Sequence, residues 1–251
     1  MVLTPFRSLV LGCLEILLPR HCVVSGLPLS ADEPGPVRAA LLREVKLAAA
    51  DYCSRCGAPQ GQGVGTVGEC ASCRDVREGF SADEMVAAGH YQPPLSDILR
   101  ALKFGGARNA AKPPAAWLTA LVFDRGLAPR VDVVVPVPLH PLRLWHRGYN
   151  QAAEIARPLA RALGKPLLDA LRRRAETAGQ ARLSAAQRRS NVEGAFAVRK
   201  PAAVTGKTIL LVDDVMTTGA TFREAALTLK RAGAKAVLGA VAARATLDDD
   251  A

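Results

Sequence analysis

Short apolar runs alternate with longer amphipathic stretches in the second half of the chain. The runs lie at 131–137, 209–212 and 236–242, and the helical patterns between them cover Asn150–Leu163 and Gly219–Ala232. Strands that are apolar throughout are buried on both faces, as in a parallel sheet covered by helices. The pattern therefore predicts an α/β fold with a central parallel sheet flanked by helices.

Proline placement and the first half of the chain add three expectations. Pro158 falls inside the first of these helical patterns, which predicts a kink or a split there. A further helix is expected over 37–50, where Pro and Gly are absent after Pro36. At the N-terminus, helical spacing predicts an amphipathic helix that carries Phe6, Val10, Cys13, Leu14 and Leu17.

The N-terminal apolar segment also resembles the core of a signal peptide. Glu15 interrupts that core, however, and no Ala-x-Ala cleavage site follows it. No apolar run in the chain has the length needed to span a bilayer. We therefore expect a cytoplasmic protein, whose 251 residues suit one medium domain and a small module.

Four cysteines form two Cys-x-x-Cys pairs, Cys53 with Cys56 and Cys70 with Cys73. Two such pairs can complete a tetrahedral shell of four sulfurs, which structural zinc prefers. Disulfides, free thiols and an Fe–S cluster are the competing interpretations, and a cytoplasmic setting disfavours the first. Cys22 begins a similar turn in which Ser25 replaces the second cysteine, and Cys13 lies on an apolar helix face, so neither is expected to bind the metal.

The net charge of +10 is unevenly distributed. Residues 171–200 carry eight Lys/Arg against two Asp/Glu, and the rest of the surplus lies in 81–170. A localised positive field attracts a diphosphate, a nucleotide or a nucleic acid, although a solvated basic face has the same composition. Charge alone does not separate these alternatives.

The strongest chemical signal follows the second apolar run. Asp213 and Asp214 are followed by a loop of small and hydroxyl residues, and a helix begins after it. Loop amides and a helix N-terminus suit a phosphate, and adjacent carboxylates suit ribose hydroxyls or a hard divalent cation. An ordinary capped turn is the alternative, but it would leave two carboxylates near the core with nothing to bind. The candidate phosphate loop comprises Met216, Thr217, Thr218, Gly219, Ala220 and Thr221.

This segment resembles the phosphoribosyl-diphosphate (PRPP) motif of type I phosphoribosyltransferases. Further segments are similar to the ComF/GntX branch of that family, whose front cysteine module this chain also shares. They are Val135–Leu139, Arg147-Gly148-Tyr149-Asn150-Gln151, Leu102–Gly106, and a pattern made by Gln180, Leu183, Arg188, Asn191 and Phe196. The resemblance implies the type I phosphoribosyltransferase fold with a small N-terminal zinc ribbon.

The resemblance also implies roles for individual residues. Thr217–Thr221 would hold the 5′-phosphate, and Asp213 and Asp214 the ribose hydroxyls, with Mg²⁺ bridging ribose and diphosphate. Arg147 would meet the diphosphate, for which a guanidinium fork is suited. Lys103, and Arg182 or Arg188 from a loop over 180–191, would complete the substrate site, although each of these cations could also be a surface residue. Trp145 and Tyr149 flank this place and are expected in the core or at the rim, and His146 is the histidine nearest to it.

Two functions from different classes follow. The first is an enzyme that transfers ribose 5-phosphate from PRPP to an acceptor, and the second is a non-catalytic protein that binds single-stranded DNA or DNA-uptake proteins. The basic region 171–200 or the cysteine module would form that contact, although 171–200 lacks the interleaved aromatic residues of a dedicated single-strand binder. A third hypothesis is that the protein is a scaffold whose phosphate pocket is vestigial. The expected division is 1–80 for the helix and zinc module, 81–246 for the phosphoribosyltransferase-like domain, and 247–251 for a disordered tail.

Overall fold

The structure is a computed structural model, and it describes residues 19–30, 32–33, 35–47, 53–58, 70, 82–174 and 194–245. Several predictions from the sequence lie outside these residues. They concern the N-terminal helix with Cys13, the fourth cysteine Cys73, the segment that contains Gln180, Arg182, Arg188 and Asn191, and the C-terminal tail.

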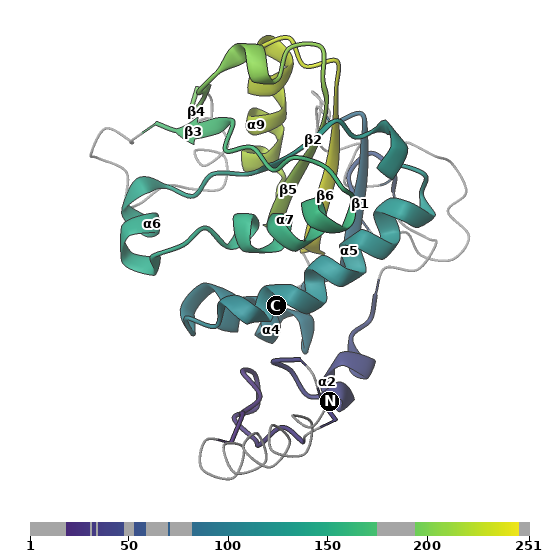
Figure 1. The fold of residues 1–251 in the computed structure, drawn as a ribbon, viewed down its shortest axis with the longest axis vertical. Coiled ribbons are helices and arrows are strands. Elements are labelled where there is room, and N and C mark those ends of the chain that lie inside the picture. The colour runs from purple at the N-terminus through teal and green to yellow at the C-terminus, as the bar shows by residue number, and fades with distance from the viewer. Residues whose placement is uncertain are drawn as a thin grey trace, which may run out of the picture.

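A four-stranded sheet forms the centre of the molecule (Figure 1). Its order is β1 (Glu84–His90), β6 (Ala236–Arg244), β5 (Thr208–Met216) and β2 (Val133–Pro136), and each neighbouring pair is parallel. The three apolar runs of the sequence thus become β2, β5 and β6, which confirms the predicted parallel sheet. β5 lies in the interior of the sheet, and its residues from Thr208 to Asp214 are all buried.

Helices cover both faces of the sheet. On one face, α4 (Leu95–Phe104), α5 (Lys112–Asp124) and α7 (Gln151–Ala162) pack against a row of strand residues that includes Leu210 and Val212. On the other, α9 (Ala220–Arg231) packs against the alternate row, which includes Ile209 and Leu211. Among the described residues, no helix is long and apolar enough to cross a membrane.

Smaller elements lie outside these layers. The helix α6 (Pro141–Arg147) follows β2 and has no buried residue, and it lies at the left of the molecule in Figure 1. A two-stranded antiparallel ribbon of β3 (Leu171–Arg173) and β4 (Phe196–Val198) packs on the face that α9 covers. The remaining elements are α2 (Ala39–Glu44) and the short 3₁₀ turns η1 (Arg108–Ala111), η2 (Ala128–Arg130) and η3 (Pro201–Ala203).

The helix predicted over 37–50 was wrong in its length. It is α2, which ends at Glu44, and Val45 is already extended. Leu47 then forms an antiparallel bridge with Gly89 of β1. A Cβ on Gly89 would lie 2.8 Å from the carbonyl oxygen of Lys46, so glycine is what lets the two segments approach. Pairing with the sheet therefore overrides the local helical preference.

Of the kink or split predicted at Pro158, the split was wrong. Pro158 lies inside α7, which continues from Gln151 to Ala162. Proline removes one helical N–H, but Ile155 and Leu159, on either side of it, are fully buried in the core. Burial of this face against the sheet outweighs the loss of one backbone hydrogen bond.

Candidate functional site

Two buried carboxylates lie near the carboxyl end of β5. Asp213 is 9% exposed and Asp214 is 4% exposed. The sequence placed them at the end of the strand, but pairing with β6 continues to Met216, so both acids lie within β5. Asp213 Oδ1 accepts a hydrogen bond from the Asp214 backbone N–H at 2.9 Å. Burial, and then the negative charge of Asp214, raises the pKa of Asp213 well above its ordinary value.

Asp214 is connected to two helices on its side of the sheet. Lys103 Nζ of α4 lies 2.8 Å from Asp214 Oδ2, and Gln151 Nε2 of α7 donates to Asp214 Oδ1 at 3.4 Å. Arg147 Nη1 in turn donates to Gln151 Oε1 at 2.5 Å. Three predicted site residues, Lys103, Arg147 and Asp214, are thus joined into one chain of polar contacts.

The loop after β5 is only partly exposed, because Gly219 is buried. Thr217 and Thr218 are exposed, and Gly219 adopts a left-handed conformation with φ of 75° directly before α9. Among the described residues, the backbone amides of Thr217, Thr218 and Gly219 have no hydrogen-bond acceptor. Free amides at a helix N-terminus can receive an anion. The side chain of Met216, by contrast, is buried, so this residue can serve a ligand only through its backbone.

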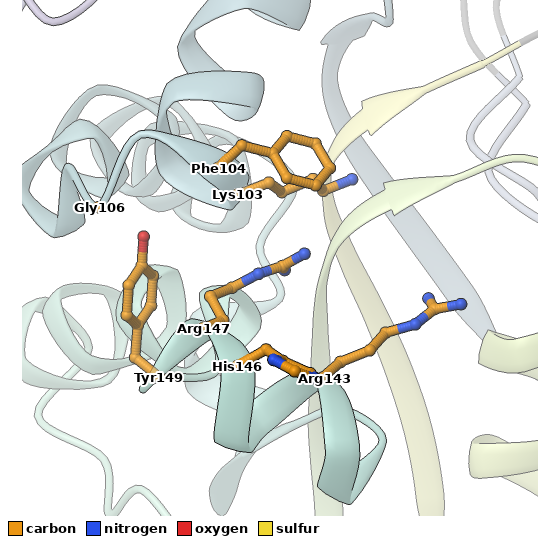
Figure 2. Close-up of a pocket in the computed structure, with 7 residues that line it drawn as sticks. All are labelled: Lys103, Phe104, Gly106, Arg143, His146, Arg147 and Tyr149. Atoms are coloured by element: carbon orange, nitrogen blue, oxygen red, sulfur yellow. The ribbon is translucent and has the colours of Figure 1, made fainter.

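A cavity of about 390 Å³ lies between the end of α4 and α6. Figure 2 shows the side chains of Lys103, Arg143 and Arg147 extending in the same direction from these two helices. Among the residues that the structure describes, no carboxylate lines the cavity, and its lining cations favour an anion. The acids of β5 do not line it either, but Lys103 lies at the cavity and contacts Asp214. Its lining residues are Lys103, Phe104, Gly106, Arg143, His146, Arg147 and Tyr149.

Tyr149 fixes one wall of this cavity. It is buried, as the sequence predicted, and its hydroxyl donates to the Leu102 carbonyl oxygen at the end of α4. Arg108 lies over the Tyr149 ring, with Cζ 4.7 Å from its centroid, and donates to the Gly148 carbonyl oxygen. These contacts hold the Arg147–Gly148–Tyr149 turn against α4.

The neighbouring aromatic residues are instead open to solvent. Trp145, expected in the core or at the rim, is 79% exposed on α6, and Phe104 is 78% exposed. Arg147 lies over the Phe104 ring, with Cζ 5.3 Å from the centroid. The sequence analysis did not select Phe104 or Arg143, although Arg143 precedes Arg147 by one helical turn and so lies on the same helix face.

The cysteines form a separate buried cluster. Cys53, Cys56 and Cys70 place their sulfurs within 4.8 Å of one another, and the Sγ atoms of Cys56 and Cys70 are 3.3 Å apart. Burial raises the pKa of the Cys56 thiol well above its ordinary value, so a charge-neutralising cation is needed to hold the thiolate there. Three converging buried sulfurs fit a tetrahedral zinc site. The predicted fourth ligand, Cys73, lies outside the described residues.

The turn at Cys22 repeats the backbone geometry of the turn at Cys53. Gly57 N donates to Cys53 O at 2.7 Å, and Gly26 N donates to Cys22 O at 2.9 Å. Both glycines have positive φ, of 66° and 70°. Ser25 stands where the second cysteine would be, and Cys22 Sγ accepts from Arg38 N at 3.5 Å. The Cys22 turn thus has the same backbone shape as the turn at Cys53. Its cysteine packs in the hydrophobic cluster on the opposite face of the sheet from the three thiols.

The chain is similar in sequence to several known proteins. Residues 149–248 match the phosphoribosyl transferase domain. Competence protein F of Haemophilus influenzae is 34% identical over 192 residues, which cover 74% of this chain and 81% of that protein. DNA utilization protein YhgH of Salmonella typhi is 36% identical over 190 residues, which cover 74% and 80%.

A solved structure of the glutamine PRPP amidotransferase of B. subtilis aligns with a TM-score of 0.38 and 23% identity, and the alignment covers 53% of this chain and 26% of that one. The domain match and the helix-flanked parallel sheet together confirm the predicted phosphoribosyltransferase fold.

Proposed function

Because this chain belongs to the ComF family of proteins with a phosphoribosyltransferase domain, we propose that it binds PRPP with Mg²⁺ and transfers ribose 5-phosphate to an acceptor. One observation carries the proposal: a buried pair of carboxylates near the end of β5 is followed by a loop, exposed at Thr217 and Thr218, whose amides have no acceptor among the described residues. Burying two adjacent carboxylates costs free energy, which a sugar phosphate and a cation would offset when they bind.

Each part of the ligand has matching groups. The amides and hydroxyls of Thr217–Thr221 would hold the 5′-phosphate beside the N-terminus of α9. The oxygens of Asp213 and Asp214 would accept hydrogen bonds from the ribose hydroxyls. They are also hard ligands that fit Mg²⁺ held jointly with substrate oxygens, and the bound ion would neutralise charge on the diphosphate.

The cations beside Asp214 suit the leaving group. Lys103 and Arg147 lie at the cavity next to this acid and would hold the diphosphate as its bond to ribose C1 breaks. The carboxylates of Asp213 and Asp214 would stabilise the positive charge that develops on the ribose. Arg188 would approach from the segment outside the described residues.

The names of two relatives suggest the setting. One is a competence protein and the other a DNA utilization protein, so we propose that this chain acts in the uptake or use of DNA. We also propose a cytoplasmic location, zinc held by Cys53, Cys56, Cys70 and Cys73, and the division at 1–80, 81–246 and 247–251.

Calorimetric titration of the purified protein with PRPP tests the function. Binding that requires Mg²⁺ is the expected result. The double variant Asp213→Ala/Asp214→Ala should lose it, because both carboxylates of the site are removed. The proposal fails if the wild-type protein does not bind PRPP at millimolar concentration.

A second candidate function, binding of single-stranded DNA, has its own supporting observation. Trp145 and Leu142 are 79% and 65% exposed on α6, and Phe104 is 78% exposed at the end of α4, while Arg143, Arg147 and Lys103 lie at the cavity between the two helices. Exposed aromatic rings stack on bases while nearby cations contact phosphates. We therefore propose α6 and the end of α4 as the DNA surface. The segment 171–200, named from its charge alone, is a weaker candidate because its described part carries no exposed aromatic residue.

Replacing Trp145 with alanine should weaken binding of a fluorescent thymidine oligonucleotide by roughly 5- to 100-fold, the loss expected for one stacked base. Phe123→Ala is the matched control, because Phe123 is an exposed aromatic residue, at 54%, on α5. Fluorescence anisotropy at several salt concentrations measures both variants. Equal losses of DNA affinity in Trp145→Ala and Phe123→Ala, or a DNA affinity that does not depend on salt, would contradict the assignment of this surface. Retained DNA binding in Asp213→Ala/Asp214→Ala would separate the DNA surface from the PRPP pocket.

A further inference from the structure

Arg244 is a buried cation directly behind the candidate phosphate loop. It is the last residue of β6, is 4% exposed, and lies opposite Met216 in the register of β5 and β6. Its Nη1 donates to the carbonyl oxygens of Met216 at 2.9 Å and Ala245 at 2.8 Å, and it also contacts that of Thr217. The Arg244 guanidinium group therefore binds two successive carbonyl groups, those of Met216 and Thr217, at the start of the loop.

These contacts determine where the loop amides point. In a planar trans peptide, the carbonyl and the following N–H point in opposite directions. Because the carbonyls of Met216 and Thr217 turn toward Arg244, the amides of Thr217 and Thr218 turn away from it. These amides have no acceptor among the described residues, and both residues are exposed. Arg244 thus aims two free donors at the open side of the loop.

We propose that Arg244 is a positioning residue for the 5′-phosphate. It sets the orientation of the Thr217 and Thr218 amides and adds a positive charge behind them, without itself touching the ligand. This role depends on the proposed function, because it assumes that the loop receives a phosphate. It differs from that of Lys103, which contacts Asp214, and of Arg147, which contacts Gln151, because these two cations would serve the diphosphate.

Arg244→Met tests the role through two ligands that share anionic chemistry. Ribose 5-phosphate should bind about tenfold more weakly than to the wild-type protein, because the loop amides lose the charge-assisted contacts that orient them and the phosphate loses a nearby positive charge. The affinity for magnesium diphosphate, which would bind through Lys103 and Arg147, should change by less than about twofold. Arg244→Lys keeps the charge and should recover part of the loss. Arg130→Met is the matched control, because Arg130 precedes β2 at the opposite end of the sheet.

A merely structural role would not produce one further result. In ³¹P NMR titrations, the pKa of bound ribose 5-phosphate should be higher in Arg244→Met, because a buried positive charge near the phosphate has been removed. Amide resonances of Thr217 and Thr218 should move on addition of inorganic phosphate to the wild-type protein.

Equal losses for both ligands, or an unchanged phosphate pKa, would overturn the role of Arg244 and leave the PRPP proposal standing. If the wild-type protein bound neither ligand, the phosphoribosyl function itself would fail, and the role of Arg244 with it.

Discussion

Replacing Asp213 with asparagine should abolish Mg²⁺-dependent PRPP binding and make the protein more stable. Binding should weaken by at least 100-fold, because the site loses one of its two carboxylates. Asparagine retains the Oδ1 atom that accepts the Asp214 backbone N–H, so the local geometry persists. The folded protein no longer buries that charge beside Asp214, and about 1–2 kcal/mol of stability should be gained, or roughly 2–8 °C in Tm.

The gain in stability should depend on pH with a definite sign. Because the pKa of Asp213 is raised in the folded state, its ionisation opposes folding at pH values above that raised pKa. The advantage of Asp213→Asn should therefore be full there and shrink as the pH falls through the folded pKa of Asp213. It should vanish below about 3.9, where the carboxyl group is protonated in both states.

Calorimetry with PRPP and thermal unfolding across this pH range measure both effects. Asp132→Asn is the control, because Asp132 accepts the Thr208 N–H at the opposite end of β5 and should not affect PRPP binding. If Asp213→Asn bound PRPP as well as the wild-type protein does, the Asp213 carboxylate would not be part of the ligand site. A loss of stability at neutral pH would show that the ionised carboxylate supports the fold and does not strain it.

Features that are contiguous in the sequence were predictable. The strands were found because parallel strands buried on both faces read as unbroken apolar runs. The strand, loop and helix that carry the candidate phosphate loop were predictable because they follow one another within 208–231. The end of β5 was placed at Asp213 and Asp214 because they end the apolar run, although pairing with β6 continues to Met216.

The cavity was predictable only in part, because its walls come from segments far apart in the sequence. Tyr149 donates to Leu102, 47 residues earlier, and this contact brings α6 to the end of α4. Nothing near Arg143 or Phe104 in the sequence signals that both will face one space. The Lys and Arg residues of the cavity all fall within 81–170, one of the two segments that carry the charge surplus.

Exposure of Trp145 could not be predicted from its residue type. Tryptophan side chains are usually well buried, and whether one is exposed depends on where its helix or strand lies in the fold. Here α6 lies outside the packed layers and has no buried residue, so Trp145 remains in solvent. Exposed aromatic residues next to cations are more informative about function than a buried aromatic residue would be.

Removal of the zinc ion that we propose for the cysteine cluster should have the largest effect on stability. Cys53, Cys56 and Cys70 belong to the same core cluster as Met85 and Ala87 of β1. Met85 N also donates to Ser54 O at 2.7 Å, inside the turn that would hold the metal. Loss of the metal would leave buried thiols crowded together and would loosen this edge of the sheet as well as the turn itself.

Cys56→Ser should therefore lose the metal and about 3 kcal/mol or more of folding free energy, given that structural zinc contributes ~10 kcal/mol in small zinc domains. Metal analysis and thermal unfolding of protein purified under reducing, chelator-free conditions measure the two effects. Cys22→Ser is the matched control, because it removes a buried thiol from a turn of the same shape and should keep one zinc per chain. Cys73→Ser should behave like Cys56→Ser. A full complement of zinc in Cys56→Ser, or none in the wild-type protein, would refute the four-cysteine site.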